Sequence, residues 1–517
     1  MKKPRQRYFN YLLLLLGLFY LLTHLFKLTA LPVFADEAIY IRWAQLIMDD
    51  WRQYLFFPLN DGKTPLLIWF FIPFQYLFAD PLLAARLISV LAGLVQIYVL
   101  GQLAKLWGGG KKAQIIAVAL SGLLPFWFFH QRMALMDQLM TLGLSLSLFF
   151  AAKLLLGKTK SKNKLNFLAL IFSLGASLWT KLSALLFAPV LVVFAWFFVP
   201  NKIKTRFSNS IMVGLAVLGG VGVFLLLKLN PAFSQLFSRG GDFLFKTQEL
   251  LSGDWRFSLS QLPRYFQELS SYLTPVVLAT PFLGLFFKQN RRQHFLNLLL
   301  SAVFLLPIFI MGKVVYARYF LPVAIFFTLS ASLFFGQLLT FVENQTKFWR
   351  KAIFGLVAAL LIGGVLSPVG FWLYTSWFDI NLIPFPKNDQ EQYLLEWSAG
   401  QGVKEVSELL LKSSQNQRVV LATEGYFGTL PDGILLYLHN RRVDNLAVTG
   451  IGQPVHQLPP DFIKQAQLAD QAWLLVNSHR LKMQLAPELL IEKYCRPQNA
   501  PCLELWDVTD LAKKASI

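Results

Sequence analysis

The sequence is poor in charged residues and in cysteine, and both shortages narrow the classes of protein that it can encode. Only 15% of its 517 residues are charged, whereas 55% are hydrophobic and 48 are Phe. This composition is far more apolar than that of a soluble globular protein, so it indicates a chain with many membrane spans. The only cysteines, Cys495 and Cys502, enclose a six-residue loop. Two alternatives stay open there: a disulfide in an oxidising compartment, or two free thiols.

Nucleotide-binding loops and metal-ligand spacings are also missing. The polar tail contains no P-loop and no glycine-rich nucleotide loop, and His130 has no second His or Cys nearby to complete a metal set. We therefore assign no metal and no cofactor.

Long apolar runs predict the membrane spans. A span must cross a hydrocarbon core of roughly 30 Å. Eleven runs meet this requirement, at 11–31, 82–104, 113–129, 137–156, 166–182, 183–199, 209–228, 272–287, 294–312, 319–340 and 351–375. The first run is too long for a cleaved signal peptide and lacks a convincing cleavage site, so we expect it to stay as an anchor. A further run at 63–78 is interrupted by Pro73 and predicts an interfacial or re-entrant helix.

Acidic and basic residues of the membrane part segregate to opposite sides. Basic residues gather in loops at 111–112, 202–206, 288–292 and 347–351, which the positive-inside rule assigns to the cytoplasm. Of the twelve carboxylates before residue 377, only Glu343 falls on that side. The net charge of +20 therefore reflects membrane topology, and we expect no nucleic-acid partner. The N-terminus is expected in the cytoplasm of a plasma-membrane protein and the C-terminus outside.

The predicted fold is an all-α polytopic membrane domain followed by a small α/β domain outside the membrane. The membrane domain is expected at 1–376, with a structured first external loop at 32–81, and the extracytoplasmic domain at 377–517. In the tail, apolar patterns predict helices at 391–413 and 433–439 and strands at 418–422, 472–476 and 502–508.

Two adjacent carboxylates, Asp36 and Glu37, lie just beyond the first apolar run. Ionisable side chains at a membrane surface are costly to desolvate, so this pair is a candidate catalytic site. Other outward-facing loops supply further candidates, which are Lys63, Arg132, Asp137, Arg318 and Tyr319.

Several of these candidates also have a structural interpretation. Lys63 could extend its side chain to the lipid headgroups and anchor the loop there. Asp137 could stabilise the N-terminus of the helix that it begins. Arg318 and Tyr319 could belong to a belt of arginine and tyrosine side chains at the level of the headgroups.

The order, spacing and sidedness of these residues resemble one family over roughly residues 10 to 375. The residues that carry the resemblance are, in chain order, Asp36-Glu37, Lys63-Thr64-Pro65-Leu66, Arg86, Asp137 with Met140-Thr141, and Arg318-Tyr319 with Leu321-Pro322. This pattern is similar to that of the polytopic glycosyltransferases of the C fold, in particular prokaryotic relatives of protein O-mannosyltransferases and lipid A aminoarabinose transferases.

The resemblance implies transfer of a sugar from a polyprenyl-phosphate donor to a hydroxyl of a protein, lipid or glycan. It implies that Asp36 is the general base, that Glu37 helps to place the acceptor, and that Lys63 and Arg318 face the donor phosphate. It also makes Asp137 the second acid of the family pattern. A single base and a single displacement predict inversion at the anomeric carbon.

Two other functions compete with this prediction. A transporter or flippase of lipid-linked sugars would carry charges along its spans, and a cell-envelope assembly protein would use its tail to bind a partner. Lys27 and Arg86 lie within or near span ends, whereas the other charges cluster at the outer surface. This distribution favours the enzyme.

Overall fold

A computed structural model describes residues 3–157, 159–199, 202–439, 441 and 444–515. The chain is mostly helical and forms two compact units. Unit 1 comprises Met1–Lys27, Phe56–Leu67 and Arg86–Phe378, and unit 2 comprises Leu28–Leu55, Ile68–Ala85 and Asp379–Ile517. Parts of the first external loop are thus grouped with the tail. The assignment of separate domains to 1–376 and 377–517 stays a prediction.

Each of the eleven predicted spans falls on a helix. These helices are α1 (Lys3–Leu25), α5 (Pro81–Ala104), α6 (Gly110–Leu123), α8 (Met136–Leu156), α9 (Lys160–Thr180), α10 (Ala188–Phe197), α11 (Ile203–Leu225), α16 (Pro275–Gly284), α17 (Arg291–Met311), α18 (Ala324–Glu343) and α19 (Phe348–Phe378). Within the described residues, seven helical stretches are long and apolar enough to cross a membrane. Shorter apolar helices include α16 and α4 (Leu66–Leu77), so the exact number of spans stays a prediction.

The longest apolar stretch, Pro81–Leu123, folds back on itself. In the turn after α5, Gly108 has a φ of 92° and Gly110 a φ of 65°. Glycine adopts such angles without a steric cost. A Cβ on Gly101 would lie only 2.7 Å from the Val118 side chain, so α5 and α6 pack closely side by side. The stretch therefore supplies two neighbouring helices.

Two helices end earlier than hydropathy predicts. α1 stops at Leu25 instead of residue 31, and Lys27 in the following turn has a φ of 47°. The span predicted at 113–129 breaks after Leu123, where Pro125 starts the separate helix α7 (Pro125–His130). Proline lacks the amide hydrogen that a continuing helix requires. Apart from Lys27 and Pro125, the residues around both turns are mostly apolar. Hydropathy alone therefore does not detect these turns.

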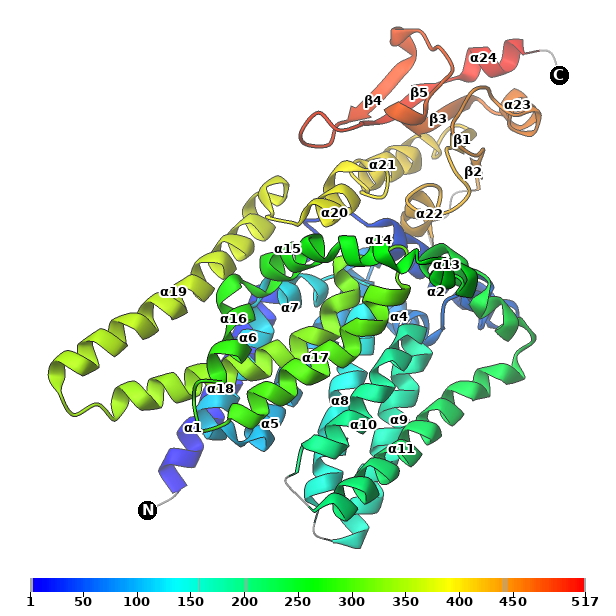
Figure 1. Ribbon diagram of the computed structural model, residues 1–517. Coiled ribbons are helices and arrows are strands. Elements are labelled where there is room, and N and C mark those ends of the chain that lie inside the picture. Colours follow the sequence, from blue (N-terminus) through cyan, green and yellow to red (C-terminus); the bar gives the residue numbers. More distant parts are fainter. Residues whose placement is uncertain (1–2, 158, 200–201, 440, 442–443, 516–517) are drawn as a thin grey trace. The chain divides into compact units, whose positions relative to one another are not determined.

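Helices α8 to α11, coloured cyan to green, lie side by side in Figure 1. The hydroxyls of Ser147 on α8 and Ser173 on α9 are 3.0 Å apart. One turn earlier on α8, a Cβ on Gly143 would lie 2.2 Å from the Ser177 hydroxyl, which is one turn later on α9. The two helices are therefore antiparallel, and the first turn of α8 lies near the last turn of α9.

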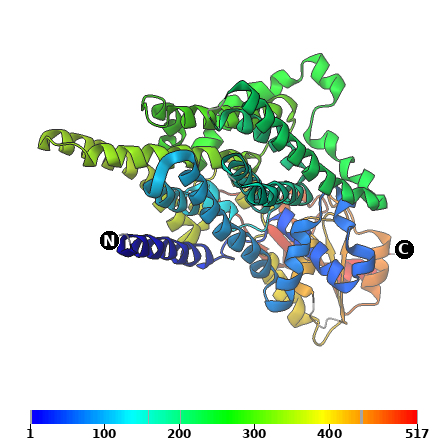
Figure 2. The same cartoon turned by 90° about the horizontal axis from the view of Figure 1, so that it is seen from below.

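α1 and α19 expose most of their apolar side chains. In Figure 2 the N-terminal half of α1, in dark blue, stands clear of the other helices of unit 1. Exposed apolar faces of this length suit helices that contact lipid.

Unit 2 contains a five-stranded sheet in the order β2-β1-β3-β5-β4. Its strands are β1 (Val419–Thr423), β2 (Leu446–Gly450), β3 (Gln471–Asn477), β4 (Leu490–Tyr494) and β5 (Leu503–Asp507). β1 pairs in parallel with β2 and β3, whereas β5 is antiparallel to β3 and β4. The sequence predicts β1, β3 and β5 from their apolar runs. It does not predict β2 and β4, whose residues are partly exposed.

The α-helices of the tail are α20 (Lys387–Gln390), α21 (Val403–Ser413), α22 (Asp432–Leu438), α23 (Pro460–Gln467) and α24 (Thr509–Lys514). The prediction of one helix at 391–413 is wrong in its middle, because the chain leaves the helix at 396–402, where Gly400 and Gly402 occur. Cys495 and Cys502 form a disulfide.

The first external loop contributes α2 (Ala35–Asp49) to unit 2, where it packs against α22. The Gln45 side chain donates a 3.0 Å hydrogen bond to the Leu436 carbonyl oxygen. The Ala35 amide donates a 3.0 Å hydrogen bond to the Ser398 carbonyl oxygen, which fixes the start of α2.

Candidate functional site

Asp137 and Lys181 meet where α8 begins and α9 ends. Asp137 lies in the first turn of α8, where a negative charge is favoured by the exposed amides of the helix, and Lys181 directly follows α9. The antiparallel packing of the two helices brings these side chains together, with Lys181 Nζ 2.6 Å from Asp137 Oδ1. The exposed fractions of the two side chains are 23% for Lys181 and 4% for Asp137. This ion pair is therefore largely shielded from water.

The segment before α18 adds Arg318 and Tyr319 to this pair. Both residues belong to the short 3₁₀ helix η6 (Ala317–Val323), and Arg318 is buried. The Lys181 ammonium lies over the Tyr319 ring, 4.6 Å from its centre. The Arg318 guanidinium lies 5.1 Å from the centre of the Tyr316 ring. Aromatic faces attract cations, so the tyrosines help to hold both positive charges in place.

Lys63 lies on the loop that precedes α4 and adds a third positive charge. The backbone amide of Lys63 donates a 3.0 Å hydrogen bond to the Pro58 carbonyl oxygen. Its ammonium lies 5.7 Å from the centre of the Phe243 ring. The neighbouring ion pair of Asp61 with Arg239, at 2.8 Å, ties the same loop to the segment after α11.

The electrostatics of Lys181 connect these groups. The positive charges of Arg318 and Lys63 lie close enough to the Lys181 ammonium to interact with it electrostatically, as does the Asp137 carboxylate. We call Lys63, Asp137, Lys181, Arg318 and Tyr319 the cationic cluster. Three of its members are cations and one, Asp137, is a carboxylate, and fixed positive charge of this kind can stabilise a bound anion.

His130 lies close to the cationic cluster at the end of α7. Burial lowers its pKa to about 4, the Asp137 carboxylate opposes this effect, and Arg318 and Lys181 add to it. The ring is therefore neutral at pH 7. Its Nδ1 lies 2.9 Å from the Phe126 carbonyl oxygen, and its buried Nε2 has no hydrogen-bond partner within the described chain.

Arg132 has a different environment from the other candidate cations. Its guanidinium donates hydrogen bonds of 2.9–3.0 Å to four carbonyl oxygens in the last turn of α1 and just beyond it, those of Thr23, His24, Phe26 and Lys27. A helix end leaves such carbonyls without partners of their own. Arg132 therefore caps α1, and this geometry favours a structural role over contact with a substrate.

Asp36 and Glu37 belong to unit 2, in the first turn of α2. The Glu37 carboxylate is fully buried and accepts a 3.1 Å hydrogen bond from the Phe34 amide. This contact satisfies an amide at the start of the helix. Asp36 precedes it and remains partly exposed. Of the two acids, Asp36 is thus the one with access to a reactant.

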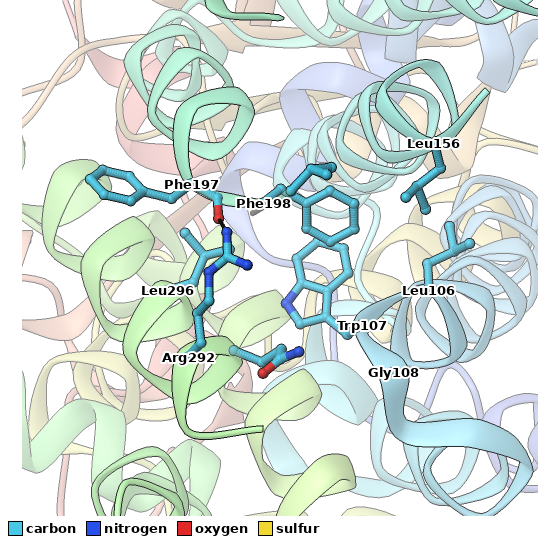
Figure 3. Close-up of a pocket in the computed structure, with 10 residues that line it drawn as sticks. Leu106, Trp107, Gly108, Leu156, Phe197, Phe198, Arg292 and Leu296 are labelled. Carbon is cyan, nitrogen blue, oxygen red and sulfur yellow. Dashed lines mark hydrogen bonds between the residues drawn. The ribbon is translucent and has the colours of Figure 1, made fainter. Parts of the chain in front are cut away.

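A cavity of about 140 Å³ lies elsewhere in unit 1 and contains none of the candidate residues (Figure 3). It is lined at the end of α8, the end of α10 and the start of α17 by Leu156, Phe197 and Arg292, with Trp107 nearby. The Arg292 guanidinium donates to the Phe197 carbonyl oxygen. Since Asp137 lies at the other end of α8, this cavity and the cationic cluster occupy opposite ends of the helices.

Sequence reasoning did not identify Lys181 as a site residue. One signal was available. Lys181 ends an apolar helix on the side where acidic residues collect, so it breaks the segregation of charge. An isolated cation in that position calls for an anionic partner, and Asp137 is that partner.

Comparison with known families gives one match. Residues 62–227 match the family described as "Dolichyl-phosphate-mannose-protein mannosyltransferase". This range includes Lys63, Asp137 and Lys181, but neither Asp36 nor Arg318. A search of curated proteins finds no match.

Solved structures share the fold along most of the chain. ArnT from Cupriavidus metallidurans in the apo state has a TM-score of 0.55 and 15% identity, covering 97% of this chain and 99% of that chain. The structure of the same protein bound to undecaprenyl phosphate has a TM-score of 0.55 and 16% identity, and the match covers 100% of both chains. The archaeal oligosaccharyltransferase AglB from Archaeoglobus fulgidus has a TM-score of 0.54 and 11% identity, and the match covers 92% of this chain and 70% of that chain. The chain therefore shares its fold with ArnT and AglB, and the family match over residues 62–227 agrees with the resemblance seen in the sequence. Together with the seven long apolar helical stretches of the described residues, the shared fold makes the chain a multi-pass membrane protein.

Proposed function

We propose that this multi-pass membrane protein of the C fold is an inverting glycosyltransferase that uses a polyprenyl-phosphate-linked sugar. The observation that carries the proposal is the cationic cluster, which brings the positive charges of Lys63, Lys181 and Arg318 near one another. The family match over residues 62–227 and the fold shared with ArnT, whose structure binds undecaprenyl phosphate, support the same class of donor.

The cationic cluster would bind the phosphate of the donor. Phosphate leaves as a stable anion, so it needs little help from a general acid and benefits from fixed positive charge. Lys63, Lys181 and Arg318 supply that charge in a largely buried setting, where its effect is stronger than in water. Asp137 is then a positioning residue that orients Lys181.

Asp36 would act as the general base on the acceptor hydroxyl. A carboxylate within hydrogen-bonding reach can take that proton as the hydroxyl attacks the anomeric carbon. The attack displaces the polyprenyl phosphate in one step, so the configuration inverts. Glu37, whose carboxylate is held by the Phe34 amide, would act by fixing the turn that carries Asp36 and not by touching the acceptor.

The reaction would take place on the extracytoplasmic side. The candidate residues lie on the side where the acidic residues collect, and the basic loops at the other helix ends favour the cytoplasm. We propose no metal and no cofactor for the reaction. The acceptor class is a protein, lipid or glycan hydroxyl.

An in vitro transfer assay tests the proposal. The full-length protein is purified in detergent and given a panel of undecaprenyl-phosphate hexoses and pentoses, with an extract of cell-envelope material as acceptor. Sugar transfer and release of undecaprenyl phosphate are both followed. Asp36→Asn is expected to lower the transfer rate by about 10²- to 10⁴-fold, the usual contribution of a general base.

The matched control is Asp49→Asn, which removes an exposed acid of the same helix. It should leave the rate unchanged. Transfer by Asp36→Asn at the parent rate would remove Asp36 from the mechanism, and transport of the intact donor across vesicles without any transfer would favour a flippase.

A further inference from the structure

Two large aromatic side chains stand exposed on a short loop of unit 2. Tyr426 and Phe427 are 72% and 60% exposed, and they come shortly after β1, behind Glu424 and Gly425. The role proposed for the cationic cluster does not use this loop, and neither Tyr426 nor Phe427 is among the buried core residues.

The loop lies at the place in the sheet where ligands commonly bind. β1 lies between β2 and β3 and is parallel to both, so the chain passes from β2 to β3 across β1. The carboxyl ends of β1 and β3 therefore flank a point at which the strand order reverses. In open α/β sheets ligands bind outside the carboxyl ends of the strands at such a point.

A buried polar contact fixes the ends of these two strands relative to each other. Glu424 follows β1 and is buried. Its carboxylate accepts hydrogen bonds from the Asn477 amide at 3.0 Å, from the Asn477 side chain at 2.6 Å and from Arg480 at 3.1 Å. The loop that carries the aromatic residues therefore starts from a rigid base.

Backbone contacts hold Tyr426 in place despite its exposure. Gly425 pairs with Gly452 through an isolated β-bridge, and its φ of 74° turns the chain outward. A Cβ on Gly452 would lie 3.0 Å from the Tyr426 hydroxyl oxygen and 3.3 Å from its ring carbons. One face of the tyrosine ring thus rests on the backbone of Gly452, which leaves the other side open to a ligand.

A third aromatic side chain, Trp397, belongs to the same edge. A Cβ on Gly428 would lie 3.1 Å from the Trp397 ring, and the Arg480 guanidinium lies 4.6 Å from the centre of that ring. The edge thus combines aromatic faces with an arginine that one carboxylate already neutralises. We call Trp397, Tyr426, Phe427, Asn477 and Arg480 the aromatic edge.

Buried oxygen atoms at the aromatic edge lack hydrogen-bond partners within the described chain. They are Thr423 Oγ1 at the end of β1, Thr429 Oγ1 after the loop and Asn477 Oδ1 at the end of β3. Buried polar atoms without a partner are uncommon and call for an explanation. These atoms are themselves closed off from solvent, so the proposed site uses the exposed aromatic faces, and not these oxygens, as its contact surface.

We propose that the aromatic edge binds a neutral saccharide chain. The C–H faces of pyranose rings pack against aromatic faces, and sugar hydroxyls pair with arginine and amide side chains at the rim of a site. The charges of Glu424 and Arg480 offset each other, which favours a neutral sugar over a phosphate. This site stands apart from the cationic cluster and does not depend on the proposed transfer reaction.

A binding measurement tests the proposal. The full-length protein in detergent micelles is titrated with cellohexaose, mannohexaose and chitohexaose by isothermal calorimetry. At least one of these probes should bind saturably. The double substitution Tyr426→Ala and Phe427→Ala should weaken that binding by at least tenfold, and Arg480→Met should weaken it as well.

The matched control is Trp51→Ala, which removes an aromatic side chain of unit 2 that is 61% exposed and lies in the short helix α3 (Trp51–Tyr54), outside the sheet. It should leave the affinity unchanged. The unfolding temperature of each variant is measured in parallel, and Tyr426→Leu, which keeps the bulk without the aromatic face, should lose affinity while staying folded.

Three outcomes would overturn the proposal. In the first, none of the three oligosaccharides binds saturably to the parent protein. In the second, the parent and the double variant bind the oligosaccharides with equal affinity. In the third, the double variant no longer binds phosphatidylglycerol vesicles but binds the oligosaccharides as the parent does. The last outcome would assign Tyr426 and Phe427 to a membrane surface. Since transfer is not measured, failure of the glycosyltransferase proposal would leave this result intact.

Discussion

Arg132 and Lys181 are both buried cations next to helix ends in unit 1, but their partners differ. Arg132 donates to four backbone carbonyl oxygens around the end of α1, so its hydrogen-bonding capacity is largely used by the fold. Lys181 has one carboxylate partner and shares its surroundings with Arg318 and Lys63. The first cation completes a helix, whereas the second belongs to a group that contains two further cations. A cation is therefore assigned to structure or to a ligand by its partners and not by its place in a motif.

The largest effect that separates the two cations is expected from Arg132→Met. The substitution leaves carbonyls at the end of α1 without a charged donor, and hydrogen bonds to charged groups contribute about 1.5–3 kcal/mol each. The variant should fail to fold or should unfold at a much lower temperature in detergent, as measured by intrinsic tryptophan fluorescence. The control Lys313→Met removes a 44% exposed partner of Glu249 and should leave the unfolding temperature nearly unchanged, because exposed ion pairs are screened by water and salt.

The contrast would be lost if Arg132→Met kept the parent's unfolding temperature and lost affinity for undecaprenyl phosphate. Arg132 would then belong with the substrate-binding cations.

A smaller effect, confined to binding, is expected from Lys181→Met. The loss of one charge-assisted contact to phosphate, worth about 1.5–3 kcal/mol, should weaken binding of undecaprenyl phosphate by roughly 10- to 100-fold. The unfolding temperature should fall less than in Arg132→Met. Microscale thermophoresis with undecaprenyl phosphate measures the affinity, and undecaprenol, which lacks the phosphate, should bind equally to parent and variant. An unchanged affinity for the phosphate would contradict the role of Lys181.

The smallest effect is expected from Asp432 in unit 2. Asp137 has a close cationic partner in Lys181, whereas Asp432 makes no ion pair within the described part of the chain. Burial raises the pKa of Asp432 to about 6, although the Gly428 amide and the more remote Arg42 oppose this. A raised pKa means that the folded state prefers the protonated acid. The stability that this group contributes is present below the unfolded pKa of about 3.9 and is lost as pH rises through about 6.

Asp432→Asn should remove this pH dependence, because its amide oxygen can still accept from Gly428. The variant should match the parent near pH 4 and exceed its free energy of unfolding by roughly 2 kcal/mol at pH 7.5. Thermal unfolding of both proteins at four pH values between 4 and 7.5 measures the difference. A constant difference across that range would show that burial of the charge is not its cause.

The sequence predicted the membrane part of the fold because long apolar runs and segregated charges are local signals. Each predicted span falls on a helix, but the turns at Lys27 and Pro125 interrupt apolar sequence and were missed. In the tail, β2 and β4 are partly exposed strands that lack the apolar pattern on which prediction depends.

The site was predictable in part. Asp137, Arg318 and Tyr319 lie at helix ends that the sequence predicts to face outward, and the structure brings them together around Lys181. The partnership of Asp137 with Lys181 depends on the antiparallel packing of α8 and α9, which no local pattern encodes. The capping role of Arg132 depends in the same way on where α1 ends. The roles of Asp36, Lys63 and Arg318 in catalysis stay predictions.

The most direct test of the central claim is an experimental structure of the full-length protein with undecaprenyl phosphate bound. The account predicts density for the phosphate within hydrogen-bonding distance of Lys181 and Arg318. Phosphate density in the cavity beside Arg292 and Trp107, with the cationic cluster empty, would contradict it.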